Sequence, residues 1–184
     1  MNKALLIIDY NNDFVADEGV LTSGKAGQAL DQPILARIKA ALADNDTVFI
    51  CNDAHDPSDC FDPEKKLFPA HCQAGSWGAE LYGESGSLLR QRLDDHDARV
   101  IYLPKLRYSA FFGTPLAYML RSRGVRELTA VGVCTDICVL HTVIDAVYEG
   151  FSVTVPADCC ATIMEHGQEW ALAHMKGCLG VNVE

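Results

Sequence analysis

The sequence predicts an α/β fold built on a mainly parallel β-sheet, and two observations carry this prediction. Short apolar runs of strand length alternate along the chain with longer segments whose apolar residues recur at helical spacing. In addition, the first run, over residues 3–8, is apolar from Ala4 to Ile8 without a break, which is typical of a strand covered on both faces.

The bulk properties of the chain limit its function. It has 184 residues, of which 49% are hydrophobic, and a formal net charge of −10 at pH 7. This length and apolar content favour a single domain over residues 1–184 and exclude a disordered chain. The negative charge argues against nucleic acid as a partner, and no apolar run is long enough to span a membrane. The N-terminus resembles a first strand more than a signal peptide, so we expect a cytoplasmic protein.

The eight cysteines are expected to be reduced thiols that mostly fill the core. Their spacings contain no paired C-x2-C knuckles of the kind that hold structural zinc. Cys134 and Cys138 have three residues between them and no such partner pair, and Cys159 is adjacent to Cys160. The pattern therefore favours neither a disulfide framework nor a structural zinc site.

The first half of the chain shows a second strand and a first helix. A loop over residues 10–29, with glycines as turn points, follows the first strand. Residues 31–43 place their apolar side chains on one face of a helix, and residues 47–51 form the second strand. The segment 56–80 is polar, rich in Pro and Gly, and not periodic. So long an irregular segment inside a compact domain is usually functional.

The second half continues the alternation of strands and helices. Residues 114–123 are predicted to be a helix with Thr114 and Pro115 at its start and Gly124 at its end. The other expected elements are a short helix over 87–93, strands over 99–103, 127–133 and 151–155, a helix containing Cys138, a helix over 165–178 and a short final strand after Gly180.

Four reactive side chains follow predicted strands closely. They are Asp9, Asp53, Lys105 and Cys138. The carboxyl ends of parallel strands lie at one edge of a sheet, and the ligands of such sheets bind beyond this edge. We therefore expect the functional site at this edge.

Cys138 is expected near the start of a helix. The strand over 127–133 leads into a tight connection in which Thr135 or Asp136 is expected to cap the helix that follows. Cys138 would then lie in the first helical turn, where unpaired N–H groups and the helix dipole favour an anion. On this basis we expect a lowered pKa for its thiol, and alkylation by iodoacetamide well below about pH 8.

Cys138, Asp9 and Lys105 together fit a thiol hydrolase. Asp9 would take the thiol proton and later pass it to a leaving amine, provided that burial raises its pKa, and Lys105 would favour the thiolate. Backbone N–H groups of Cys134 and Cys138 would form an oxyanion hole. His141, one helical turn after Cys138, offers an alternative Cys–His dyad, although packing or helix hydrogen bonding suits its position better.

A second set of residues has the chemistry of metal ligands. Asp53 and His55 alternate along an extended strand end and therefore point to the same side, where they can share one ion. His71 would complete a set of two imidazoles and one carboxylate, and Glu64 offers a fourth ligand. Zinc, manganese and iron all accept such ligands.

Apolar side chains of the loops near this edge are candidates for a flat binding pocket. Aromatic rings in such loops can stack on a planar ligand. The candidates are Phe14, Phe68, Tyr108 and Trp77, with Leu21 as an aliphatic neighbour.

Motifs along nearly the whole chain match those of a known family in order. From residue 3 to the C-terminus, the sequence resembles the nicotinamidase/pyrazinamidase branch of the isochorismatase-like cysteine hydrolases. The Asp…Lys…Cys set and the turn before Cys138 are specific to the superfamily, and the Asp-x-His…His set points to the branch. The matching stretches are Ile7-Ile8-Asp9-Tyr10-Asn11-Asn12-Asp13-Phe14, Asp53-Ala54-His55, Leu67-Phe68-Pro69-Ala70-His71-Cys72, Gly75-Ser76-Trp77-Gly78-Ala79-Glu80, Lys105 and Gly132-Val133-Cys134-Thr135-Asp136-Ile137-Cys138-Val139.

The resemblance implies a fold and a reaction. The fold has three layers, a mainly parallel six-stranded sheet with helices on both faces. Cys138 would be the nucleophile, Asp9 the general acid and base, and Lys105 the third catalytic residue, with a cis peptide between Val133 and Cys134. The implied reaction converts nicotinamide and water to nicotinate and ammonia through a thioester on Cys138, in NAD salvage.

The resemblance also implies a cofactor and a binding mode. A divalent metal, zinc in first place with manganese or iron as alternatives, would hold the ring nitrogen of the substrate, and Phe14, Phe68 and Tyr108 would bind the ring. Relatives are commonly homo-oligomers, so we expect one here. The sequence departs from the family at Asn11, where Gln is frequent, and Glu64 would be a ligand additional to the usual three.

Three other hypotheses stay open. A cysteine amidase acting on another small amide or ureido compound would keep the thiol chemistry, but it would not need a metal to hold a ring nitrogen. A non-catalytic metal-binding or small-ligand-binding module would have no reason to retain Asp9, Lys105 and Cys138 together. A redox sensor built on Cys134 and Cys138 is the third.

Overall fold

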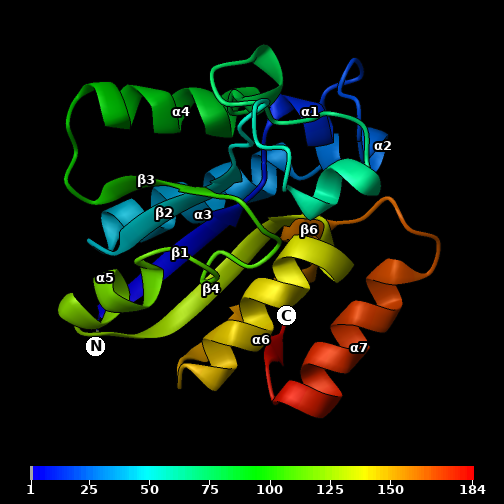
Figure 1. The fold of residues 1–184 in the computed structure, drawn as a ribbon. Helices are drawn as coiled ribbons and strands as arrows, with labels where there is room; N and C mark the ends of the chain where they lie inside the picture. The colour runs from blue at the N-terminus through cyan, green and yellow to red at the C-terminus, as the bar shows by residue number, and fades with distance from the viewer. Residues whose placement is uncertain (1) are drawn as a thin grey trace.

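The computed structural model describes residues 2–184, and a twisted parallel sheet forms its centre (Figure 1). The strand order is β3-β2-β1-β4-β5-β7, with β6 beside β4, and every pairing is parallel. The predicted fold class is confirmed, and the two-residue strand β6 is an addition to it. The strands are β1 (Asn2–Ile8), β2 (Thr47–Asp53), β3 (Val100–Lys105), β4 (Val125–Val133), β5 (Ser152–Val155), β6 (Cys160–Ala161) and β7 (Asn182–Val183).

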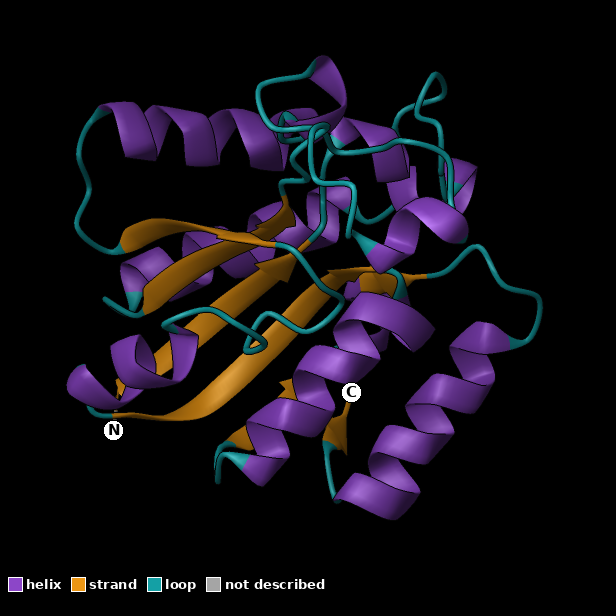
Figure 2. Cartoon of the chain, viewed as in Figure 1, coloured by secondary structure: helices purple, strands orange, loops and turns teal. Residues whose placement is uncertain are grey.

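Helices cover both faces of this sheet, which gives the expected three layers (Figure 2). Buried residues of α3 and α4 pack on one face, and those of α5, α6 and α7 pack on the other. The helices are α1 (Asn12–Val15), α2 (Gly24–Gln28), α3 (Asp31–Ala43), α4 (Gly83–Asp94), α5 (Leu116–Ser122), α6 (Leu140–Tyr148) and α7 (Gly167–Leu179). Single turns are η1 (Pro63–Lys66), η2 (Trp77–Ala79), η3 (Thr135–Val139) and η4 (Ala157–Cys159).

The unbroken apolar run of β1 supplies both layers of the core. Successive side chains of a strand point to opposite faces. Leu5 and Ile7 therefore join the cluster under α3 and α4, while Leu6 and Ile8 join the cluster under α5, α6 and α7. This strand lies between β2 and β4 in the interior of the sheet.

Two sequence-based expectations for helices are wrong in their extent. The loop predicted over residues 10–29 contains α1 and α2, and α4 begins at Gly83 and not at residue 87. The early start of α4 has a tertiary cause, because the carboxylate of Asp31 on α3 accepts the backbone N–H groups of Glu84 (2.9 Å) and Ser85 (3.0 Å). These are N–H groups of the first helical turn, which have no partner within the helix.

The order of the strands places a crevice where the site is expected. The chain runs outward from β1 to β2 and β3, then crosses to β4 on the other side of β1. At such a reversal the connections leave the sheet in opposite directions, and ligands bind beyond the carboxyl ends of the strands there. Asp9 follows β1 directly, and the turn with Cys138 follows β4.

Candidate active site and metal-ligand group

Lys105 lies at the centre of the candidate active site. It is the last residue of β3, and its side chain is 1% exposed. Its Nζ lies 2.7 Å from Oδ2 of Asp9 and 2.5 Å from Oδ1 of Asp53, and it donates to the carbonyl oxygen of Arg107 at 3.2 Å. The ammonium group therefore has three oxygen neighbours, so its charge is buried but compensated.

Asp9 has an environment that suits proton transfer. It is fully buried and adopts a left-handed φ of 51° at the end of β1. Burial and the nearby carboxylate of Asp53 raise its pKa to about 7, against the opposing effect of Lys105. For Lys105, burial by itself would lower the pKa, but the carboxylates of Asp53 and Asp9 outweigh it and raise the pKa well above its usual value.

Cys138 faces these two groups from the turn that follows β4. The thiol sulfur of Cys138 and carboxyl oxygens of Asp9 and Asp53 all lie within 4.8 Å of one another. Burial raises the pKa of this thiol well above its usual value, and the carboxylate of Asp9 adds to the effect although Lys105 opposes it. The expected lowering of the thiol pKa is therefore wrong, because burial disfavours the thiolate and the carboxylates of Asp9 and Asp53 offset the effect of Lys105.

The turn that carries Cys138 differs from the expected capped helix. Residues Thr135–Val139 form a π-helical turn before α6, and neither Thr135 nor Asp136 caps it. Their side chains are engaged elsewhere, because the hydroxyl of Thr135 donates to Oε1 of Gln168 at 2.5 Å and Asp136 accepts the hydroxyl of Thr162. These two hydrogen bonds attach the turn to α7 and to the segment before it. The peptide bond between Val133 and Cys134 is cis.

The four predicted metal-ligand residues lie together beside this centre. Asp53, His55, Glu64 and His71, called here the metal-ligand group, are all buried, and each offers one ligand atom within 4.8 Å of the others. Nε2 of His55 lies 3.7 Å from Oδ2 of Asp53 and 3.7 Å from Oε2 of Glu64. Nδ1 of His71 lies 2.8 Å from the carbonyl oxygen of Pro69, which leaves Nε2 to face Asp53 at 4.0 Å.

This donor set fits a divalent cation. Both ring nitrogens of His55 and Oε1 of Glu64 are buried without a hydrogen-bond partner, which would be costly for polar atoms that nothing else satisfies. Two imidazoles and two carboxylates suit zinc, manganese or iron. Burial and Asp53 raise the pKa of Glu64, as expected for buried carboxylates that lie close together.

Asp53 contacts both the residues around Lys105 and the metal-ligand group. Its Oδ1 faces Lys105, its Oδ2 faces the two histidines, and its backbone N–H donates to Oδ1 of Asp9 at 2.7 Å. Burial would raise the pKa of Asp53, but Lys105 and His55 outweigh it, so the carboxyl stays ionised.

A pocket lies between Cys138 and the metal-ligand group. It encloses about 370 Å³ of free space, including its open mouth. Trp77 is not part of its wall but half-exposed, with its carbonyl bound to the side chain of Asn12, so this expectation is wrong. The wall contains the four expected side chains Phe14, Leu21, Phe68 and Tyr108, together with Ile137, Ile163, Cys134, Cys138, Asp53, Glu64 and His71.

The alternative Cys–His dyad has no support in the geometry. His141 is exposed on α6, and its Nδ1 lies 2.7 Å from the carbonyl oxygen of Ile137. Its ring packs beside Tyr108 at 5.3 Å between centroids. In this structure His141 therefore makes a hydrogen bond within its helix and packs against Tyr108.

Sequence reasoning missed two buried carboxylates near the site. Oδ2 of Asp13 accepts the backbone N–H of Cys72, next to His71, at 2.6 Å. Asp62 accepts the N–H of Glu64 and contacts His55. The sequence Asp62-Pro63 carries a signal for the second, because Asp before Pro is typical of the start of a helical turn.

Fold and side chains together define a class, namely an α/β protein with a Cys–Asp–Lys set and a metal-ligand group at the carboxyl edge of its sheet. Comparison with known proteins gives the family: the model of the isochorismatase domain matches residues 3–183, and the chain belongs to the isochorismatase family. The resemblance to the nicotinamidase/pyrazinamidase branch is confirmed by similar proteins that carry this name.

Three of these similar proteins illustrate the relationship. The crystal structure of nicotinamidase/pyrazinamidase PncA from Bacillus subtilis has a TM-score of 0.96 and 43% identity, and covers 100% of this chain and 99% of its own. The nicotinamidase/pyrazinamidase of Mycobacterium tuberculosis is 33% identical over 95% of this chain and 94% of its own. The pyrazinamidase of Pyrococcus horikoshii, solved in complex with zinc, has a TM-score of 0.83 and 26% identity over 100% and 99% of the two chains.

Two general properties also follow from the structure. All eight cysteines are free thiols, as the sequence predicts. Among residues 2–184, no helix combines the length and the apolar character that crossing a bilayer requires.

Proposed function

We propose that this protein is a metal-dependent nicotinamidase, an amidohydrolase that converts nicotinamide and water to nicotinate and ammonia. The observation that carries the proposal is that Asp53 contacts Lys105 and is also a member of the metal-ligand group. One pocket lies between Cys138 and this group. Full-length similarity to proteins named nicotinamidase/pyrazinamidase supports it.

The first half of the reaction uses the thiol of Cys138. Asp9, with a pKa raised to about 7, accepts the thiol proton as sulfur attacks the amide carbonyl carbon. Backbone N–H groups of Cys134 and Cys138 receive the negative charge on the carbonyl oxygen, and Lys105 stabilises the charge on sulfur until the bond forms. Protonated Asp9 then gives its proton to the leaving nitrogen, the C–N bond breaks, and ammonia and a thioester on Cys138 result.

The second half uses the same groups in reverse order. Asp9 takes a proton from a water molecule that attacks the thioester carbonyl. The C–S bond breaks, the proton returns to the sulfur of Cys138, and nicotinate leaves. Asp9 is suited to both directions because a carboxyl group with a pKa near 7 gains and loses a proton with similar ease at neutral pH.

The metal-ligand group would bind the cofactor and place the substrate. Asp53, His55, Glu64 and His71 would hold a divalent cation, with zinc first and manganese or iron as alternatives; a similar pyrazinamidase was solved with zinc. The bound ion supplies a Lewis-acid site for the ring nitrogen of nicotinamide. Phe14, Phe68, Tyr108 and Leu21 would enclose the ring. They would leave the amide directed at Cys138.

The test is ammonia release by the metal-loaded protein from nicotinamide, from benzamide, which lacks the ring nitrogen, and from an N-carbamoyl compound. We expect turnover of nicotinamide that is lost in Cys138→Ala and weakened mainly through KM in His71→Ala, with benzamide a much poorer substrate. Preference for the N-carbamoyl compound would replace the proposal by the ureido-amidase alternative. No turnover of any amide would favour the binding-module hypothesis.

Several wider properties belong to the same proposal. A place in NAD salvage follows from the reaction, and a cytoplasmic location is supported by the free thiols. A single domain over residues 1–184 and assembly into a homo-oligomer stay predictions, which limited proteolysis and light scattering would check.

A further inference from the structure

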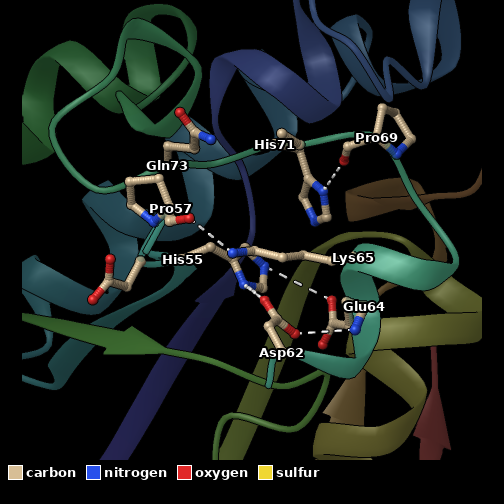
Figure 3. Close-up of a pocket in the computed structure, with 10 residues that line it drawn as sticks. His55, Pro57, Asp62, Glu64, Lys65, Pro69, His71 and Gln73 are labelled. Carbon is tan, nitrogen blue, oxygen red and sulfur yellow. Dashed lines mark hydrogen bonds and ion pairs between the residues drawn. The ribbon is translucent and has the colours of Figure 1, made fainter. Parts of the chain in front are cut away.

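We propose that Asp62 is a positioning residue for the metal-ligand group, which turns one ring nitrogen of His55 toward the ion and fixes the backbone that carries Glu64. This inference rests on the metal site of the proposed function, but it concerns the binding of the ion and not the chemistry at Cys138. Asp62 contacts His55 and the backbone of Glu64 at the same time (Figure 3).

The first contact of Asp62 fixes the ring of His55. Oδ2 of Asp62 lies 2.9 Å from Nδ1 of His55, and both side chains are buried. The two atoms are at ion-pair distance but not in the alignment of a hydrogen bond, so Asp62 acts on the ring through its negative charge. A carboxylate beside Nδ1 favours the neutral tautomer that carries its proton there, which leaves the lone pair on Nε2. Nε2 is the nitrogen that faces Asp53 and Glu64 at 3.7 Å each. Asp62 therefore selects the coordinating nitrogen.

The second contact fixes the position of Glu64. Oδ1 of Asp62 accepts the backbone N–H of Glu64 at 3.0 Å and so caps the turn η1, which begins at Pro63. Without this acceptor an N–H group in the first turn would have no partner. One carboxylate thus positions an imidazole ligand with one oxygen and the backbone of a carboxylate ligand with the other.

Arg107 makes the buried charge of Asp62 tolerable. Its Nη1 lies 3.3 Å from Oδ1 of Asp62, and the carbonyl oxygen of Arg107 accepts from Lys105. The segment with Asp62 is thereby attached to the strand end that carries Lys105. Asp62 itself is not a member of the metal-ligand group, because both of its oxygens are already engaged.

His71 provides an internal comparison for this role. Its Nδ1 faces the carbonyl oxygen of Pro69, a neutral acceptor, at 2.8 Å. Both histidines therefore have an oxygen atom within 2.9 Å of Nδ1 and direct Nε2 to the group, but only at His55 does this oxygen belong to a side chain that can be replaced. This makes Asp62 the position at which the arrangement can be tested without changing a ligand.

The experiment measures Zn²⁺ affinity by competition with a chelating indicator on the full-length protein. Asp62→Asn keeps the size of the side chain and an oxygen for the N–H of Glu64, but it can turn an NH₂ group toward Nδ1 of His55. We expect affinity to fall by about 10–100-fold. The matched control is Asp59→Asn in the same segment, which removes the same charge from a carboxylate that accepts only the N–H of Phe61, and it should stay within about twofold of wild type.

A second measurement separates positioning from a general loss of structure. Because Asp53 raises the pKa of His55 in the metal-free protein, ¹⁵N spectra are recorded at a pH high enough to keep its ring neutral. The ring of His55 should then carry its proton on Nδ1 in wild type and shift toward Nε2 in Asp62→Asn, while the signals of His71 stay in place. A Zn²⁺ affinity of Asp62→Asn within twofold of wild type, an equal loss in Asp59→Asn, or an unchanged tautomer of His55 would each overturn the inference. Tight Zn²⁺ binding by a wild type that releases no ammonia from nicotinamide would instead sink the proposed function and leave the role of Asp62 intact.

Discussion

At the scale of single residues, the main feature is the unequal number of charges around the thiol. Lys105 carries one positive charge, whereas Asp9 and Asp53 carry two negative charges when both are ionised. A thiolate added to this set would have no further partner. Cys138 is therefore held as a thiol, and its proton leaves only when Asp9 can receive it.

A pH titration of thiol alkylation tests this charge balance. The raised pKa of Cys138 means that its thiolate appears only above the pH at which an ordinary cysteine ionises, so alkylation by iodoacetamide in the metal-free protein should rise later with pH than at the exposed Cys60. Asp9→Asn removes the adjacent negative charge and should shift the profile of Cys138 to lower pH. Peptide mass spectrometry reports both sites, and a wild-type profile at or below that of Cys60 would contradict the charge balance.

Gly132 shows how closely the strands approach below the site. Its φ is 123°, and a Cβ at this position would lie 1.9 Å from the backbone oxygen of Ile8. Gly132→Ala should therefore destabilise the protein by about 3 kcal/mol or more in urea unfolding. Gly177→Ala is the control, because nothing lies within 4 Å of a Cβ there and the α7 helix should gain about 0.5–1 kcal/mol. Equal effects of the two changes would be incompatible with this packing.

At the scale of elements, the residues of the site are positioned in two ways. Some lie at the ends of strands, and the others lie in an irregular segment that contacts with other elements keep in place. Asp9, Asp53 and Lys105 are placed by β1, β2 and β3, which pair side by side in the sheet. Residues 54–82, in contrast, contain only two short helical turns, and the candidate ligands Glu64 and His71 depend on contacts that this segment makes with other elements. Asp13 on α1 provides one of them through the N–H of Cys72.

Removal of the Asp13 carboxylate should destabilise the irregular segment that carries His71. A buried charged acceptor contributes about 1.5–3 kcal/mol, so Asp13→Ala should lower the free energy of unfolding by that amount and weaken Zn²⁺ binding through displacement of His71. Asp17→Ala removes an exposed carboxylate from the same loop, bound only to Gln28, and should have little effect on either quantity. Zn²⁺ affinity of Asp13→Ala equal to that of Asp17→Ala would exclude this role.

At the scale of the whole molecule, the metal site joins segments from different parts of the chain. The metal-ligand group spans from the end of β2 to the segment before η2, and Lys105 extends the contact to β3. An ion that binds only the folded chain stabilises all of these contacts together. Folding and metal binding should therefore be linked.

Thermal unfolding measures this linkage. Zn²⁺ at about one hundred times its Kd should add about 2.7 kcal/mol of stability, which for a chain of this size corresponds to a Tm about 5–10 °C higher. A chelator should reverse the rise, and His71→Ala should show a much smaller one. A Tm that is independent of Zn²⁺ in wild type would exclude the linkage.

The parts that could be predicted from sequence depend on local patterns, and the others depend on distant contacts. Asp9, Lys105 and Cys138 could be predicted as site residues because each comes at or just after the end of an apolar strand. His55 could be predicted because it alternates with Asp53. The start of α4 could not be predicted from local sequence, because it depends on a hydrogen bond with Asp31 of another helix. The raised pKa of Cys138 was missed for a similar reason, because the helix-terminus argument did not include the burial of the thiol or the charge of Asp9.

The central claim, that Cys138 forms a thioester with the acyl group of nicotinamide, is tested most directly by hydroxylamine in the reaction of the metal-loaded enzyme. Hydroxylamine attacks a thioester more readily than water does, so part of the product should change from nicotinate to nicotinohydroxamic acid while ammonia release continues, and Cys138→Ala should form neither. Ammonia release with nicotinate as the sole product at every hydroxylamine concentration would contradict the thioester on Cys138.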